Sequence, residues 1–351
     1  MVATMPGDLV SNRPQLWAVE TETLMGTGQR CSFATGLLSL AMASFASLSV
    51  CAEAAGANPP AGQCSLAVVS RFMRGGKVCD VGTILRLAHQ GQVYQQNQLG
   101  IASVLALGPD YSAQEALKWF ERAALRGYAP AQVNLAIMYA NGWGTPQNYG
   151  AALQWLKAAS EQHYARADYN LGIFYMQGTG VRQDYHEALR WFKRAADAGD
   201  SSAQTNLGYL YDRGLGVAPN ASTAVSWYVK AAEAGNSLGE YNLGDMYFQG
   251  QGVARNDSEA FHWFQKAANQ GHTGARIKLA YMYVQGLGTK TDPEYAYALI
   301  TAASLAGDNR GRDLVPSLER LLSSQQISAA KARAAALQTS QSVTTAAALA
   351  P

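Results

Sequence analysis

The sequence predicts an all-α protein built as a solenoid of helix-turn-helix repeats, and three observations support this. Tryptophans recur every 36 residues, at Trp119, Trp155, Trp191, Trp227 and Trp263. Leucines keep the same spacing, at Leu99, Leu135, Leu171, Leu207, Leu243 and Leu279. Each leucine is followed by Gly or Ala, and a glycine closes most units. A fixed period without insertions, from about residue 84 to 307, is typical of repeats that pack only on their neighbours.

The amino end carries a predicted export signal at residues 25–52. Arg30 precedes an uncharged run at residues 33–50, and small residues follow it, the pattern of a secretory signal peptide. We expect cleavage after Ala52 and a periplasmic or secreted mature protein. Residues 1–24 fit no targeting pattern, so we interpret them as a spurious or disordered leader before a true start at Met25.

Two alternatives for this segment stay open. The uncharged run approaches the roughly 20 residues that span a bilayer, so the signal can remain uncleaved as an anchor in the inner membrane. Cys51 can also be the acylated residue of a lipoprotein. Cleavage after Ala52 leaves Cys64 and Cys79 in residues 53–79, an N-terminal linker or cap. Export favours a disulfide between them, and two free thiols are the alternative.

Residues 203–235 show how one repeat is built. Apolar residues at helical spacing predict a first helix, which a Gly-x-Gly turn at 214–216 ends. A second amphipathic helix follows through Trp227 and ends at Gly235. Neither helix buries its apolar face alone, so the repeats must stack. We expect small residues such as Gly208 to let helices approach closely, and the Trp227 ring to fill the groove between repeats.

This pattern resembles the Sel-1-like repeat, a relative of the tetratricopeptide repeat with a longer turn between its helices. The family pattern is met at Ala167, Leu171, Gly172, Tyr175, Gly178, Gly180, Val181, Ala188, Trp191, Phe192, Ala195, Ala196 and Gly199. Five or six units match, over about two thirds of the chain. The first unit departs from the pattern, with Ser103 and Ala106 in place of Tyr and Gly. The resemblance implies a right-handed α/α superhelix.

The resemblance also sets the domain boundaries that we expect. Residues 80–307 form the solenoid, as a half repeat followed by six repeats. Residues 308–337 form capping helices, because an open solenoid end exposes its core. Ser324 is positioned to N-cap the second of these helices. Residues 338–351 are expected to be a disordered tail.

The search for catalytic chemistry predicts a protein that is not an enzyme. The Gly-x-Gly elements follow helices, not the strands that precede phosphate-binding loops. The five histidines show no metal-ligand spacing, so we predict no metal and no cofactor. Ser328 and Lys331 match the S-x-x-K motif of penicillin-recognising enzymes, but the partner motifs are missing. An envelope hydrolase acting on β-lactams or peptidoglycan through these two residues remains the alternative.

The partner we expect is a protein or a peptide. A net charge of +2, from 27 basic and 25 acidic residues, gives no electrostatic reason for nucleic-acid binding. In superhelices of this family the first helices line the concave face. Residues between the core positions, at steps of three and four, share one helical face there. The candidate contact residues are Tyr169, Asn170, Ile173, Asn206, Tyr209, Arg213, Tyr241, Asn242, Asp245 and Tyr281.

These residues make a row of asparagine amides flanked by aromatic rings, which suits an extended or helical peptide. The alternative is that the asparagines are structural and hydrogen-bond neighbouring turns. We therefore predict a monomeric, non-enzymatic scaffold of the bacterial cell envelope that binds a protein partner. A membrane-anchored regulatory adaptor is the second alternative to this function, and it applies if the signal is not cleaved.

Overall fold

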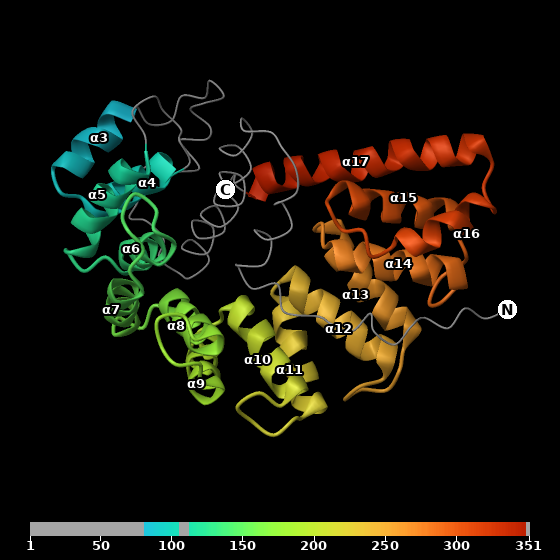
Figure 1. The fold of residues 1–351 in the computed structure, drawn as a ribbon, viewed down its shortest axis with the longest axis horizontal. Coiled ribbons are helices and arrows are strands. Elements are labelled where there is room, and N and C mark those ends of the chain that lie inside the picture. The colour runs from blue at the N-terminus through green and yellow to red at the C-terminus, as the bar shows by residue number, and fades with distance from the viewer. Residues whose placement is uncertain (1–80, 105–111, 349–351) are drawn as a thin grey trace. The chain divides into compact units, whose positions relative to one another are not determined.

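The computed structural model describes residues 81–104 and 112–348 of the chain. This part is helical and contains no strand (Figure 1). The predicted leader, the signal peptide and both Cys64 and Cys79 lie outside the described residues. No described helix combines the length and the apolar character that crossing a bilayer requires.

The helices follow one another in pairs, as the repeat pattern predicts. α3 (Val81–His89) is the expected half repeat. The first helices of the repeats are α4 (Val93–Val104), α6 (Ala129–Asn141), α8 (Ala165–Gln177), α10 (Ser201–Arg213), α12 (Ser237–Gln249) and α14 (Thr273–Gln285). The second helices are α5 (Ala113–Ala124), α7 (Tyr149–Ser160), α9 (Tyr185–Asp197), α11 (Ala221–Glu233), α13 (Asp257–Asn269) and α15 (Pro293–Leu305).

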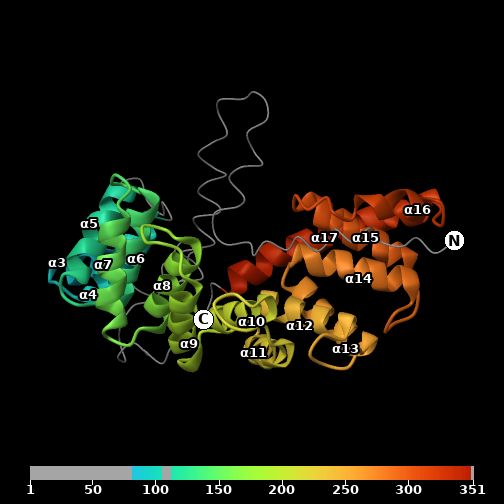
Figure 2. The same cartoon turned by 60° about the horizontal axis from the view of Figure 1, so that its bottom comes forward.

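From α3 to α15, each helix packs against the next one along the chain, both inside a repeat and across the boundary between repeats (Figures 1 and 2). First helices of neighbouring repeats also touch, as α10 and α12 do. The prediction of an all-α repeat solenoid is therefore confirmed.

From the second repeat on, the turn inside each repeat has a constant hydrogen-bonding plan. The first helix ends at a glycine in the left-handed conformation, for example Gly214 at φ +66°. The second helix begins at an Asn, Asp or Ser whose side chain accepts a backbone N–H of the first turn, as Asn220 does from Thr223. The backbone N–H of Asn220 also donates to the carbonyl of Tyr211, at 2.8 Å. The Gly-x-Gly elements are turns, as predicted.

The second glycine of the turn is needed for contact between repeats. Gly216 has φ +68°, and a Cβ built there meets the carbonyl carbon of Tyr185 at 2.5 Å. Tyr185 begins the second helix of the preceding repeat, so the turn lies directly on that helix. A side chain larger than hydrogen at Gly216 pushes the two repeats apart.

The close approach inside each repeat depends on the residue after the tryptophan. Built at Gly172, a Cβ meets the ring of Phe192 at 2.6 Å, and at Gly244 it meets Phe264 at 2.8 Å. These rings are fully buried, whereas Trp227 is only half-buried. Inside that repeat the ring that packs on Gly208 is Tyr228, so the close approach of the two helices does not depend on Trp227. The expectation that Trp227 fills the groove between repeats stays a prediction.

The carboxyl end differs from the expected caps. In place of one helix over residues 314–322, a 3₁₀ turn (Arg312–Leu314) leads into the short helix α16 (Val315–Glu319). α17 (Ser324–Ala348) follows and packs against α15. The hydroxyl of Ser323, one residue before the expected cap, accepts the backbone N–H of Gln326. α17 also continues to Ala348, past the expected end at residue 337, because this stretch is rich in alanine.

Candidate binding surface

The predicted contact residues divide into a buried group and a solvent-facing group. Tyr169, Ile173 and Tyr241 are only 6–7% exposed. The predicted residues that reach solvent on α10, α12 and α14 are Asn206, Tyr209, Arg213, Asn242, Asp245 and Tyr281. Lys278 of α14 was not in the prediction but also reaches solvent next to Asp245. We call these seven residues the first-helix face. Asn170 is the corresponding half-buried residue of α8.

The two buried tyrosines belong to the core. The Tyr169 ring lies 5.9 Å from Phe192, with the Arg166 guanidinium 4.8 Å from its centroid. Tyr241 stacks on the imidazole of His272 at 4.5 Å, with 22° between the ring planes. Both rings therefore join neighbouring elements and offer little surface to a partner. Residues three apart lie on the same side of a helix, so this spacing alone does not distinguish a residue at the edge of the core from an exposed one.

The asparagines do not bond one another along the first-helix face. The Nδ2 groups of Asn170 and Asn206 each donate to the carbonyl oxygen four residues earlier, at 2.7 and 2.9 Å. Asn134, in an earlier repeat, donates instead to the Oδ1 of Asn97. These bonds agree with the structural role that was the alternative for the row. Within the described residues, nothing donates to the Oδ1 of Asn170 or Asn206, so each amide keeps an acceptor.

An ion pair crosses the first-helix face from α12 to α14. The Nζ of Lys278 lies 2.8 Å from the Oδ1 of Asp245, and both side chains are partly exposed. Gln249 also donates to this carboxylate. Burial lowers the pKa of the Lys278 ammonium, but Asp245 outweighs this effect and leaves the pKa above its usual value. The Lys278 ammonium therefore stays charged, and the ion pair restrains both side chains.

A second carboxylate lies beside this pair and was missed by sequence reasoning. Asp212 on α10 pairs with Arg213 at 3.4 Å. Burial raises the pKa of the Asp212 carboxyl and the negative charge of Asp245 raises it further, while Arg213 opposes this. Phe248 was missed as well, although its ring meets Tyr281 edge-on at 6.2 Å. Asp212 and Phe248 occupy the same position in successive 36-residue repeats, and this spacing could have identified both from the sequence.

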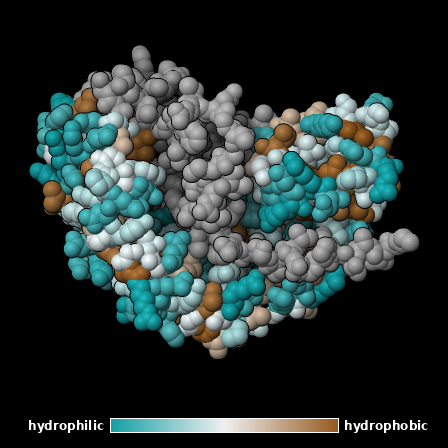
Figure 3. Space-filling view, in the orientation of Figure 1, coloured by the Kyte–Doolittle hydropathy of each residue, from teal (hydrophilic) through white to brown (hydrophobic). Residues whose placement is uncertain are grey.

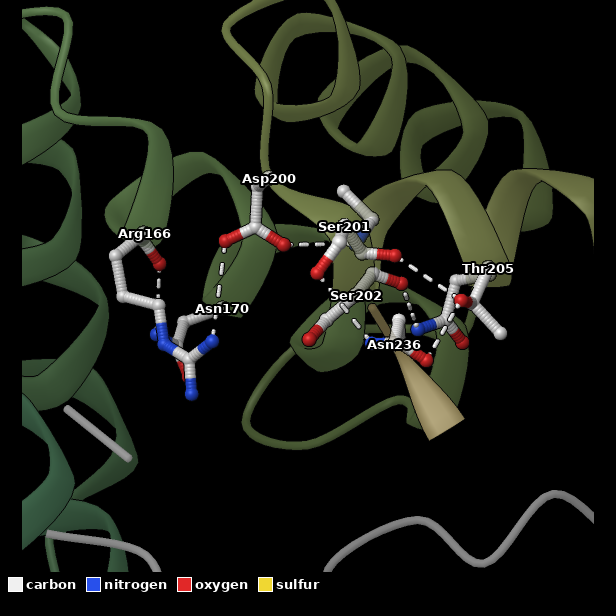
Figure 4. Close-up of polar contacts among 9 residues, drawn as sticks. Arg166, Asn170, Asp200, Ser201, Ser202, Thr205 and Asn236 are labelled. Carbon is white, nitrogen blue, oxygen red and sulfur yellow. Dashed lines mark hydrogen bonds and ion pairs between the residues drawn. The ribbon is translucent and has the colours of Figure 1, made fainter. Parts of the chain in front are cut away.

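A polar network at the amino ends of α10 and α12 holds successive first helices together (Figure 4). Asp200 caps α10 and pairs with Arg166 of α8 at 3.8 Å. Further along, Thr205 donates to the Oδ1 of Asn236, and the Nδ2 of Asn236 donates to Ser201 at 3.4 Å. These bonds position α8, α10 and α12 relative to one another, and with them the first-helix face.

The residues of the hydrolase alternative lie elsewhere. Ser328 and Lys331 are exposed on α17, and within the described residues neither makes a hydrogen bond or an ion pair. The described ranges 81–104 and 112–348 also contain no group of three His, Cys, Asp or Glu side chains able to hold a metal. The surface seen in Figure 3 is mostly hydrophilic over the described residues, with small scattered apolar areas.

Comparison with known proteins supports the repeat assignment. The Sel1 repeat family model matches residues 96–128, 129–164, 165–200, 201–236, 237–272 and 274–308. A Sel1 repeat protein from Oxalobacter formigenes is similar in structure, with TM-score 0.60 and 32% identity over 62% of this chain and 89% of that one. A protective antigen of uropathogenic Escherichia coli with an SLR fold shares 26% identity, over 81% and 66% of the two chains, with TM-score 0.47. No curated protein matches the sequence.

Proposed function

Because the chain belongs to the Sel1 repeat family, whose members generally mediate protein–protein interactions, we propose that it is a scaffold that binds a partner protein on the first-helix face. The Asp245–Lys278 ion pair carries this proposal. It holds two charges of opposite sign against each other on a face that also offers amide acceptors. Asp245 occupies the same position in its repeat as Tyr209 and Tyr281 do in the repeats before and after it.

This combination suits an extended protein segment. Tyrosine gives a large contact area at a small entropic cost, and it is enriched among the residues that dominate binding energy. The asparagine Oδ1 atoms accept backbone N–H groups of a peptide, which do not depend on its sequence. The neighbouring opposite charges then favour a segment that presents its own charges in the matching order.

An affinity capture from an envelope extract tests this function, with residues 53–351 as the bait. A parallel bait carries Tyr209→Ala, Asp245→Asn and Tyr281→Ala. A matched control changes two exposed residues of α7 and one directly after it, Gln154→Ala, Lys157→Ala and Glu161→Ala. Thermal unfolding of all baits checks that they fold.

A partner that the original and control baits retain, and that the first-helix variant loses, supports the proposal. A partner held equally by all three baits, or lost equally from both variants, excludes the first-helix face as its site.

We also propose that the scaffold works in the cell envelope after export. Support comes from Arg30, the uncharged run at residues 33–50 and the small residues up to Ala52. The intact mass of the protein recovered from the periplasm tests this. A mass that begins at residue 53 is expected, whereas a membrane-bound chain that retains residues 25–52 indicates the anchored adaptor.

A further inference from the structure

The half repeat α3 lacks a neighbour that the later second helices have. From α5 to α13, each second helix packs on the first helix of its own repeat and on the first helix of the next one. α3 packs on α4, but the described residues contain no first helix before it. In the 36-residue register, the place of that helix corresponds to residues 57–69. A residue before a proline avoids the helical conformation, so after Pro59 a helix in this segment begins at Pro60.

Cys64 is the residue of this segment that matches α3. In each later repeat, a glycine or alanine of the first helix stands 20 positions before a buried residue of the second helix. In the last repeat these two residues are Ala280 and Ile300. The equivalent buried residue of α3 is Ile84, only 2% exposed, and the residue 20 positions before it is Cys64. A free cysteine behaves as a small apolar side chain, so it fits opposite an isoleucine as alanine does.

Gln63 departs from the register in the way that an end repeat requires. Every later repeat has a leucine at this position. Leu99 and Leu243 each belong to a core cluster with buried residues of the second helix that precedes them. The first repeat of a solenoid has no preceding second helix, so the same position faces solvent there and a polar residue is expected.

Gln98 on α4 indicates where a preceding first helix lies. First helices of neighbouring repeats are joined by side-chain hydrogen bonds, for example from the Nδ2 of Asn134 to the Oδ1 of Asn97 at 2.9 Å. Gln98 holds the position of Asn134 one repeat earlier and is only 8% exposed. Its buried Oε1 accepts no hydrogen bond from the described residues. Because an unpaired buried amide oxygen is costly, a donor on a preceding helix is favourable at this point.

We propose that residues 60–69 form the first helix of the half repeat and cover α3, with the Cys64 thiol packed on Ile84 and Gln63 towards solvent. Residues 70–80 then form the turn to α3, longer than the regular turn between α6 and α7. The segment adjoins α3 along the chain, so its effective concentration at this helix exceeds that of a separate molecule. The solenoid then has one full repeat more than the six that follow α3. The proposal does not depend on what the first-helix face binds.

The reactivity of the Cys64 thiol tests this placement in residues 53–351, which hold two cysteines, Cys64 and Cys79. The variants Cys79→Ser and Cys64→Ser each keep one thiol. Cys79 is the matched control, because its register position holds the partly exposed Glu115 and Glu187 in later repeats. Ellman's reagent measures the rate of reaction of each thiol in the folded protein and in urea.

We expect folding to slow the reaction of Cys64 by about tenfold or more, and that of Cys79 by less than about threefold. Equal slowing of the two thiols overturns the proposal. Protection of Cys64 that disappears on dilution overturns it as well, because a second copy of the chain is then what covers α3.

The same placement excludes a disulfide between Cys64 and Cys79. Cys79 stands five residues before Ile84, which is about 7.5 Å along a helix, and the distance between the paired helices adds to this. A disulfide needs Cα atoms within about 7 Å of each other. Alkylation of the unreduced chain in urea should therefore label both thiols. A mass without label, which indicates a bridge, overturns the proposal.

An exchange of side chains tests the contact itself. Ile84→Phe alone should lower the Tm by about 3 °C or more, because the larger ring overlaps Cys64. Adding Cys64→Gly should restore most of this loss, since glycine accompanies phenylalanine in the pair Gly172 and Phe192. Cys79→Gly in the same background is the control and should restore none of it. Equal effects of the two glycine substitutions overturn the proposal.

Discussion

Gly172 and Phe192 form a matched pair in which the backbone of α8 lies against a buried ring on α9. A Cβ at Gly172 meets that ring at 2.6 Å. Every repeat shows the same match between positions 20 residues apart. Glycine accompanies an aromatic residue in the pairs Gly100–Phe120, Gly172–Phe192, Gly208–Tyr228 and Gly244–Phe264, and alanine accompanies an aliphatic one in Ala136–Leu156 and Ala280–Ile300. The space between the two helices is therefore filled in one of two ways.

The Gly172→Ala variant tests this match. We expect it to lower the free energy of unfolding by about 1–3 kcal/mol, because the new methyl group overlaps a buried ring. Phe192→Leu alone costs about 1 kcal/mol or more by leaving a void. In urea unfolding, the double variant should lose about 1 kcal/mol less unfolding free energy than the two single variants lose together. Strict additivity means that the two residues are not matched.

The Ala234→Gln variant should stabilise the protein by about 0.5–1.5 kcal/mol. The buried Oε1 of Gln204 has no hydrogen bond. At the equivalent positions of two other repeats, Gln162 donates to Gln132 and Gln270 to Glu240, both at 2.8 Å. Ala234 occupies the donor position for Gln204 and has no side-chain donor.

Ala198→Gln is the matched control for that variant. Its acceptor position holds Asp168, which already binds Ser160 and Arg194. Thermal unfolding should show a gain for Ala234→Gln and little change for Ala198→Gln. A gain of the same size in both variants points to helix propensity instead of the hydrogen bond.

His163→Gly should raise the free energy of unfolding by about 0.5–1 kcal/mol. His163 has φ +58° at a position where the other repeats have glycine. The left-handed conformation strains a residue with a Cβ. Urea unfolding of the variant and the original protein under the same conditions measures this difference. No gain in the variant means that the His163 side chain compensates for the strain.

Stability should fall between about pH 6.5 and 4 because of His272. Its Nδ1 accepts the backbone N–H of Ala275 as the cap of α14, and burial together with Arg310 lowers its pKa to about 4. A lowered pKa favours the neutral imidazole in the folded state. The stabilisation that the neutral His272 gives is complete above its pKa in the unfolded chain, near 6.5. It decreases as the pH falls below that value and is lost once the pH has fallen through the pKa in the folded protein, about 4. The loss is at most about 3 kcal/mol.

His272→Asn keeps a capping oxygen without a titrating group, as Asn236 does one repeat earlier. The variant and the original protein should therefore differ in the slope of stability against pH within that window, measured by urea unfolding. Parallel curves exclude His272 as the cause, since the carboxyl groups that also titrate there are common to both proteins.

The period of the sequence predicts the architecture but not which side chain occupies the centre of each repeat. Helical spacing places Trp191 and Phe192 on adjacent directions, only about 100° apart. The buried one is Phe192, because its ring packs closely on Gly172, whereas the indole of Trp191 stays half-buried beneath Arg194. Each glycine was evident in the sequence. What the sequence analysis did not make was the link between that glycine and the aromatic residue 20 positions later.

The candidate site was predicted in part for a similar reason. Asp245 and Tyr281 reach solvent as expected, but Tyr169 and Tyr241 lie in the core. The Asp245–Lys278 pair joins residues 33 positions apart, which is one repeat less three residues. That offset is a diagonal between neighbouring first helices, and it is only evident once their packing is known.

The match between Gly172 and Phe192 is closed within a single repeat, since both residues belong to the same helix pair. A whole unit can be duplicated or deleted without separating a glycine from its ring. The turn glycines, such as Gly216, instead meet a surface supplied by the unit before them. Changes in length by whole repeats therefore preserve the interior of each unit. The number of repeats, and with it the extent of the first-helix face, can evolve separately from the packing inside each unit.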